Sequence, residues 1–287
     1  MRFRDHGFAP GILKPGSLNR ISDVSRVTVG HHTRVEGDRV RTGVTVVDPG
    51  TPNLFHEKLP AAVAVGNGFG KMTGTTQIDE LGTLETPIAL TSTLAVGQVM
   101  QGMVDLVLRD TGDVPAVSTI NVVVGETNDG FLNDSHGTAV EPSDVAAAWH
   151  ARTAEFGLGC VGAGTGTAAF SWKGGIGTAS RVVPIEGTDY TVGALLQTNF
   201  GGALTIMGVP VGTMLGTTDF DKHLPGRGDG SCMIVLATDA PFSARQLGRI
   251  ARRAMLGLAR TGSVMAHGSG DYAIAFSTAS EVRRKWD

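Results

Sequence analysis

One junction in the sequence joins a flexible polar segment to a serine at the start of an apolar run. Residues 216–230 (GTTDFDKHLPGRGDG) are rich in glycine and polar residues and lack periodicity, which is typical of an exposed loop. The strand-like run SCMIVLAT follows directly, so Gly230 and Ser231 lie where the loop meets the strand. Such a junction fits a site of self-cleavage, and it also fits an ordinary connection between a loop and a strand.

Cleavage at this junction would change the chemistry of Ser231. A serine hydroxyl is a weak nucleophile unless a base lies within hydrogen-bond reach. A chain that begins with serine carries its own base, since the α-amine has an ordinary pKa of about 7.7–8.0 and is partly neutral near pH 7. Glycine at position 230 leaves room around the bond and tolerates a strained backbone. One cut between Gly230 and Ser231 would therefore create a nucleophile together with its base.

Other reactive motifs are missing from the sequence. It contains no G-x-x-x-x-G-K-[ST] phosphate loop, no G-x-S-x-G nucleophile elbow, no H-E-x-x-H and no C-x-x-C. His31 and His32 are adjacent, so their rings would lie on opposite faces of a strand and could not share a metal. We therefore expect no metal and no cofactor. A conventional Ser-His-Asp triad has no local signature but stays open.

The composition of the 287-residue chain is that of a globular protein. Hydrophobic residues make up 41% and charged residues 18%, with a net charge of −3, which argues against disorder and against a nucleic-acid partner. Only two cysteines are present, which excludes a disulfide framework. We find no secretory signal and no apolar run long enough to span a membrane. We therefore expect a single domain over residues 1–287, without a membrane partner, in the cytoplasm.

Valine-rich and isoleucine-rich runs alternate with turns and helical patterns, which indicates an α/β protein. Apolar spacing predicts helices over 94–108 and 144–156, and a third helix that begins after Ser243, where Gln246 completes a capping box. The arginines of the run 245–260 would then lie on the solvated face of that helix. Nine segments read as strands: 24–29, 43–47, 61–65, 117–124, 181–185, 191–196, 203–207, 232–237 and 272–278.

The segment around Ser231 resembles a known protein family. GDGSCMIVLATDAP, the helix ARQLGRIARRAMLGLARTGS and the segment HGSGDYAIAFSTA are similar to the nucleophile-bearing subunit of the DmpA/BapA family. Its members are L-aminopeptidase D-amidase/D-esterases and β-aminopeptidases, and nylon-oligomer hydrolases are relatives. Six further blocks match in the family's order, so the resemblance covers nearly the whole chain: NRISDVSRVTVGHHT, NGFGKMTG, ELGTLETPIALTSTLAVGQV, ETNDGFLND, VGAGTGTAAFSWKGGIGTAS and LLQTNFGG.

This resemblance implies a fold and an assembly. The fold would be a four-layer α-β-β-α sandwich, of the type shared with ornithine acetyltransferase. Self-cleavage between Gly230 and Ser231 would give an α chain of residues 1–230 and a β chain of residues 231–287. The two chains would stay together as a heterodimer, and four heterodimers would assemble into a larger oligomer.

The resemblance also implies roles for four residues around the nucleophile. Ser231 would attack the substrate, and the side-chain amide of Asn199 would stabilise the oxyanion. Ser269 and Asp271 would contact the new amine and the serine hydroxyl, and would tune the proton affinity of the amine. Taken by itself, Asn199 could equally be a polar cap at a strand end, and Ser269 and Asp271 could be part of a turn.

Two further residues bear on the substrate, which would be a short peptide or an amino-acid amide or ester. By resemblance, Glu126 would pair with the free amino group of that substrate. Asn128 occupies a position where some aminopeptidase members carry an aromatic residue. This departure keeps open an amidohydrolase for linear ω-amino-acid amides. An alternative from another class is an unprocessed binding homologue that has lost activity. Asn67, Gly68 and Glu80 belong to matching blocks but have no role that the sequence assigns.

Overall fold

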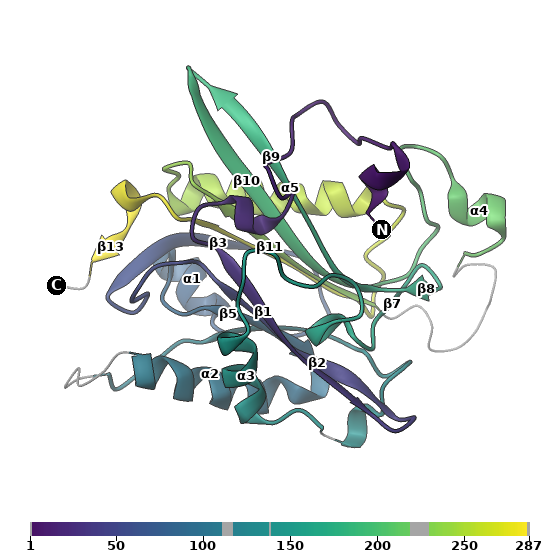
Figure 1. Ribbon diagram of the computed structural model, residues 1–287, viewed down its shortest axis with the longest axis horizontal. Helices are drawn as coiled ribbons and strands as arrows, with labels where there is room; N and C mark the ends of the chain where they lie inside the picture. Colours follow the sequence, from purple (N-terminus) through teal and green to yellow (C-terminus); the bar gives the residue numbers. More distant parts are fainter. Residues whose placement is uncertain (1, 111–116, 138, 219–229, 286–287) are drawn as a thin grey trace.

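A computed structural model describes residues 2–110, 117–137, 139–218 and 230–285. Two β-sheets lie face to face, and helices cover both outer faces, so that the layers run helix, sheet, sheet, helix (Figure 1). The expected four-layer α/β sandwich is therefore confirmed. Most of the expected loop 216–230 lies outside the described residues. Within the described residues no helix is long and apolar enough to cross a membrane.

The first sheet has four strands and is covered by two helices. Its outer face packs against α2 (Val96–Asp110) and α3 (Pro142–His150). The two strands at one side, β5 and β6, run parallel, so their carboxyl ends lie at the same edge of the sheet. In spatial order the strands are β1 (Thr28–Glu36), β2 (Val40–Asp48), β5 (Ile88–Ser92) and β6 (Val123–Thr127).

The second sheet has seven strands and is covered on its outer face by α5 (Ala244–Ala259). The seventh strand, β4 (Thr83–Leu84), pairs with β3 at the side of the main ladder. In spatial order the other strands are β13 (Arg284–Lys285), β3 (Glu57–Gly68), β12 (Gly270–Ser277), β11 (Ser231–Thr238), β10 (Thr188–Asn199) and β9 (Gly175–Ile185).

Three apolar clusters fill the spaces between the four layers. Met233 and Val235 of β11 belong to the cluster between the sheets, and Cys232 and Ile234 belong to the cluster beneath α5. A third cluster lies between α2, α3 and the four-stranded sheet. Because β11 is buried on both faces, its sequence is a continuous apolar run rather than an alternating one.

The expected start of α5 is confirmed in atomic detail. The side-chain oxygen of Gln246 accepts hydrogen bonds from the backbone nitrogen and the hydroxyl of Ser243, each at 2.9 Å. The first of these bonds satisfies the backbone N–H of the N-cap residue, which has no partner within the helix. The remaining short elements are α1 (Thr75–Leu81), α4 (Val211–Leu215) and the hairpin of β7 (Ala168–Ala169) and β8 (Trp172–Lys173).

Four of the expected elements lack the expected conformation over four residues or more. The strand expected at 24–29 starts only at Thr28, because Arg26 adopts a φ of 70° in a turn. The helix expected over 144–156 ends at His150, after which Thr153 exchanges two backbone hydrogen bonds with Val29. Segment 203–207 is no strand and bonds instead to the turn after α5, and the strand expected at 117–124 begins at Val123.

Candidate active site

Ser231 begins β11 at the centre of the seven-stranded sheet and is 3% exposed. Its neighbour on β10 is Asn199, in antiparallel register, and its neighbour on β12 is Gly270, in parallel register. Successive side chains of a strand point to opposite faces. Ser231 therefore lies on the same face as Met233 and Val235, toward the space between the sheets.

The carbonyl of Gly230 is held by two donors. Its oxygen accepts a hydrogen bond from the Ser231 hydroxyl at 2.6 Å and another from the backbone nitrogen of Gly270 at 3.1 Å. The residue itself is packed closely, since a Cβ at this position would lie 2.6 Å from the Cα of Phe200. The Gly270 donor would stabilise the negative charge that attack by the Ser231 hydroxyl on this carbonyl would create.

The Asn199 side chain is buried beside Ser231 and has a fixed orientation. Its Oδ1 accepts a hydrogen bond from the backbone nitrogen of Ala168 at 2.9 Å, and its Nδ2 donates to the carbonyl of Asn128 at 2.7 Å. An amide nitrogen carries two hydrogens, so one remains after the bond to Asn128. Directly paired residues of an antiparallel ladder have their Cβ atoms about 5 Å apart. The geometry thus suits Asn199 as an oxyanion donor.

Asn128 contributes its backbone rather than its side chain to this arrangement. The exposed side chain accepts a hydrogen bond from the backbone nitrogen of Gly130 at 3.0 Å, and thereby shapes the turn after β6. The next residue, Asp129, is buried and accepts hydrogen bonds at 2.7 Å from the hydroxyls of both Thr42 and Ser92. Burial raises the pKa of Asp129, and these donors oppose the shift. This network fixes the carbonyl that orients Asn199.

Asp271 lies on the other face of the seven-stranded sheet. It is the partner of Cys232 in the parallel ladder, and Cys232 packs beneath α5. A Cβ on Gly66 would lie 3.4 Å from the Cβ of Asp271 and 2.7 Å from the sulfurs of both Met255 and Met265. The carboxyl group of Asp271 therefore lies in apolar surroundings, on the face of the sheet opposite to the Ser231 hydroxyl.

The carboxyl group of Asp271 has no hydrogen-bond partner among the described residues, and the residue is fully buried. Burial raises its pKa, and the nearby Ser269 hydroxyl opposes this shift without reaching hydrogen-bond geometry. Burial also raises the pKa of the Cys232 thiol, and the charge of Asp271 adds to that shift. A positive charge placed beside Asp271 would stabilise its carboxylate.

Asn67 holds the loop that carries Ser269, a role that the sequence alone did not assign. Its Nδ2 donates to the carbonyls of Ala266 at 3.0 Å, His267 at 2.9 Å and Ser269 at 2.5 Å. Three acceptors gathered on one amide nitrogen fix the course of the backbone between α5 and β12. Glu80, which the sequence also left without a role, is exposed on α1.

Glu126 lies near the end of β6 and is 2% exposed. Its Oε1 accepts a hydrogen bond from the backbone nitrogen of Lys71 at 3.0 Å and forms an ion pair with the Nζ of Lys71 at 3.1 Å. A Cβ on Gly70 would lie 3.1 Å from this Oε1 and 3.2 Å from the Cα of Gly270. The Glu126 carboxylate and the start of β12 therefore both pack against Gly70. The Tyr272 hydroxyl donates to the Gly70 carbonyl at 2.9 Å. Glu126 therefore lies close to the strand pair that carries Ser231.

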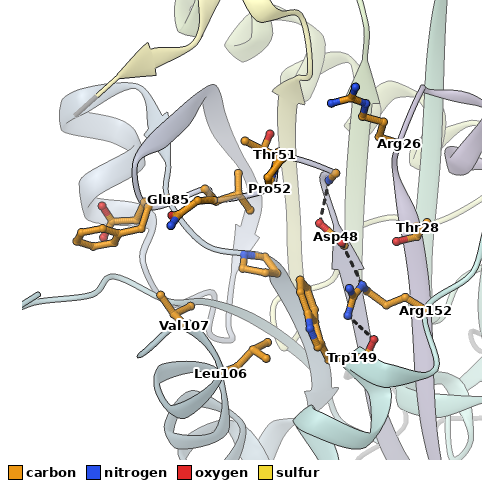
Figure 2. A pocket seen from close by; sticks show the side chains of 15 residues that line it. Arg26, Thr28, Asp48, Thr51, Pro52, Glu85, Leu106, Val107, Trp149 and Arg152 are labelled. Carbon is orange, nitrogen blue, oxygen red and sulfur yellow. Dashed lines mark hydrogen bonds and ion pairs between the residues drawn. The ribbon is translucent and has the colours of Figure 1, made fainter. Parts of the chain in front are cut away.

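Two cavities lie apart from these residues. One, of about 450 Å³, is bounded by the segment after β2 and the carboxyl ends of α2 and α3, and Trp149, Arg152 and Asp48 line it (Figure 2). It includes Pro87, which precedes β5, whereas Glu126 lies toward the opposite ends of β5 and β6. The other, of about 530 Å³, is a mostly apolar groove between β10 and α5. Neither cavity contains Ser231, Asn199 or Glu126.

The fold and the site together define the class of protein. A layered α-β-β-α sandwich with a buried serine at the start of a central strand, and with an amide donor directly beside it, is that of an N-terminal-nucleophile hydrolase. The sequence profile of peptidase family S58 matches residues 19–286. The chain belongs to this family, and the expected family resemblance is confirmed.

Individual relatives agree with this assignment. The β-peptidyl aminopeptidase BapA of Sphingosinicella xenopeptidilytica is 42% identical over 302 aligned positions, which cover 98% of this chain and 74% of BapA. The PH0078 protein of Pyrococcus horikoshii OT3 superposes with a TM-score of 0.91 at 46% identity, over 99% of this chain and 81% of that structure. The L-aminopeptidase D-Ala-esterase/amidase of Ochrobactrum anthropi superposes with a TM-score of 0.91 at 37% identity, over 100% of this chain and 80% of that structure.

Proposed function

We propose that the chain cleaves itself between Gly230 and Ser231. The Ser231 hydroxyl attacks the Gly230 carbonyl carbon, its proton passes to the departing Ser231 nitrogen, the peptide bond breaks, and an ester joins Gly230 to the serine oxygen. Water then hydrolyses the ester, which leaves a carboxylate on Gly230 and a free α-amine on Ser231. Two observations support this step: the Ser231 hydroxyl already lies against the Gly230 carbonyl group, and the backbone nitrogen of Gly270 donates to the same oxygen, where it stabilises the negative charge of the tetrahedral intermediate.

After cleavage, Ser231 acts as the nucleophile and its α-amine as the base. Asn199 stabilises the substrate oxyanion with its remaining amide hydrogen. Ser269 and Asp271 contact the new amine, and the buried carboxylate of Asp271 gains a counter-charge when that amine is protonated. The mechanism requires no metal and no cofactor.

The substrate is a short peptide, an amino-acid amide or an ester with a free amine. One observation carries this proposal: the carboxylate of Glu126 is almost fully buried and lies close to the strand pair of the nucleophile. A shielded carboxylate is a suitable partner for an ammonium group. The names of the relatives, β-peptidyl aminopeptidase and L-aminopeptidase, agree with an amine-bearing substrate.

An amidohydrolase for linear ω-amino-acid amides is the alternative within the same family. The exposed Asn128 side chain favours it, because a small polar group there leaves more room than an aromatic ring. An unprocessed binding homologue is the alternative from another class, and an uncut wild-type chain would support it.

Mass spectrometry of freshly purified protein tests self-cleavage. We expect two fragments, residues 1–230 and 231–287, that stay together under native conditions, whereas Ser231→Ala remains a single chain. An uncut but active wild type would exclude the N-terminal-nucleophile mechanism.

Kinetics of matched substrates test the amine site. We expect wild type to prefer an amino-acid p-nitroanilide with a free amine over its N-acetyl counterpart. In Glu126→Gln this preference should collapse, because removing one member of a partly desolvated charge pair costs about 2–5 kcal/mol. A wild type without any preference for the free amine would favour the ω-amino-acid amidohydrolase.

The oligomeric state and the cellular location are further parts of the proposal. We propose an oligomer of α/β heterodimers, expected to be a tetramer, which size-exclusion chromatography with light scattering would test. We propose the cytoplasm as its location, as expected from the sequence.

A further inference from the structure

Lys71 occupies one side of the carboxylate to which the proposed substrate amine binds. This lysine contacts the carboxylate through its backbone nitrogen and through its Nζ, and both contacts are to Oε1 of Glu126. The Nζ also donates to the hydroxyl of Thr93 at 2.9 Å. The two side chains differ strongly in burial: that of Lys71 is 49% exposed, and that of Glu126 is 3% exposed.

We propose that Lys71 is a specificity-determining residue that competes with the substrate amine for Glu126, an inference that rests on the proposed amine site. A second ammonium group bound to Oε2 would lie within a few ångströms of the lysine ammonium, and like charges at that distance repel. Lys71 therefore weakens the binding of free-amine substrates relative to substrates that carry no charge at this position.

Because the Lys71 side chain is half-exposed, its ammonium group can move away from Glu126 into solvent. Its only described anchors besides Glu126 are the Thr93 hydroxyl and its own backbone, so the ammonium can turn toward solvent when a substrate amine arrives. The backbone bond to Oε1 stays in place during this movement. Glu126 thus keeps its position while its counter-ion is exchanged.

The consequence is a tolerant amine site. Since Glu126 and Lys71 together are neutral, the resting site does not require a cation at one fixed point. Substrates whose amine lies one carbon further from the amide, or whose amine is blocked, lose less than they would against an unpaired carboxylate.

Lys71→Met tests this proposal, because it removes the ammonium but retains the backbone donor to Oε1. We expect KM for a free-amine p-nitroanilide to fall about fivefold to tenfold, with kcat changed less, since a partly exposed charge acts through screened electrostatics. The ratio of kcat/KM for the free-amine and N-acetyl substrates should rise by the same factor. Lys71→Arg should retain the wild-type ratio.

Three controls make the outcome decisive. Lys14→Met removes a lysine at an exposed position outside the site and should leave the ratio unchanged. The extent of self-cleavage shows whether each variant is folded. A wild type and Glu126→Gln with equal ratios would mean that the amine site itself is wrong. If that site holds but Lys71→Met lowers or preserves the free-amine ratio, Lys71 only supports Glu126 and the proposed competition is wrong.

Discussion

At the scale of single residues, the chemistry depends on how one amide is oriented. Asn199 receives a backbone hydrogen bond on Oδ1 and donates one from Nδ2, so its two ends cannot exchange without losing both bonds. A donor that is fixed before the reaction stabilises the oxyanion without reorganisation. The surrounding backbone, rather than the asparagine alone, therefore creates the oxyanion site.

We expect Asn199→Ala to lower kcat by about 10²-fold or more, with a smaller effect on KM, because the lost donor acts mainly in the transition state. Self-cleavage should slow in parallel if the same amide serves that step. The measurement is steady-state kinetics on protein whose processing has been verified by mass spectrometry. Normal turnover in a fully processed variant would remove Asn199 from the site.

At the scale of elements, the start of β11 is positioned by the strands on both sides. Asn199 on β10 and Gly270 on β12 flank Ser231, and the backbone of Phe200 leaves no room for a side chain at Gly230. Both the nucleophile and the bond that it would cut are therefore determined by the register of three strands.

We expect Gly230→Ala to slow self-cleavage at least tenfold, because the added methyl would lie 2.6 Å from the Cα of Phe200 and 2.8 Å from the carbonyl oxygen of Asn199. Overpacking of this kind costs about 1–3 kcal/mol. Gly177→Ala in β9 is the matched control, since a methyl there meets nothing within 4 Å. Gel electrophoresis over time gives both rates, and equal rates would show that the strand start can shift.

At the scale of the whole molecule, the segment after Ser231 cannot separate from the rest without dismantling the core. Strands β11 and β12 lie between β3 and β10, and α5 covers the same sheet. The β3–β12 and β10–β11 pairings therefore each join one proposed fragment to the other, which is why we expect the fragments to copurify.

Acid should destabilise the whole fold through His31. Burial lowers its pKa from 6.5 to about 4, and the neutral ring fits its partners, with Nδ1 2.9 Å from the Thr45 hydroxyl and Nε2 3.1 Å from the Gly157 carbonyl. The unfolded chain binds the proton more tightly, so this contribution to stability is present above pH 6.5 and is lost as the pH falls toward 4.

The expected loss is on the order of 2 kcal/mol over that interval. Thermal unfolding of wild type and His31→Gln between pH 7 and pH 4 measures it. The variant should be less stable at pH 7 and should lose less stability on acidification. Parallel curves for the two proteins would show that the folded chain protonates His31 as readily as the unfolded chain does, which would contradict the lowered pKa.

The sequence by itself determined the elements whose signal is local. The capping box at Ser243 and the continuous apolar run after Ser231 predicted α5 and β11, because such patterns depend on neighbouring residues alone. The ordered motifs of the family determined the layered fold. The expected end of α3 was wrong because a distant residue determines it: Thr153 pairs with Val29, far away in the chain, instead of continuing the helix.

Only the tertiary structure decided how the reactive residues meet. No sequence pattern shows that Asn199 and Gly270 flank Ser231, because these pairings join segments more than 30 residues apart. The same holds for Asn67, whose three carbonyl acceptors lie some 200 residues further along the chain. The ion pair of Lys71 with Glu126 is equally non-local. Residue types fix which chemistry is possible, whereas strand register and packing fix the distances at which it takes place.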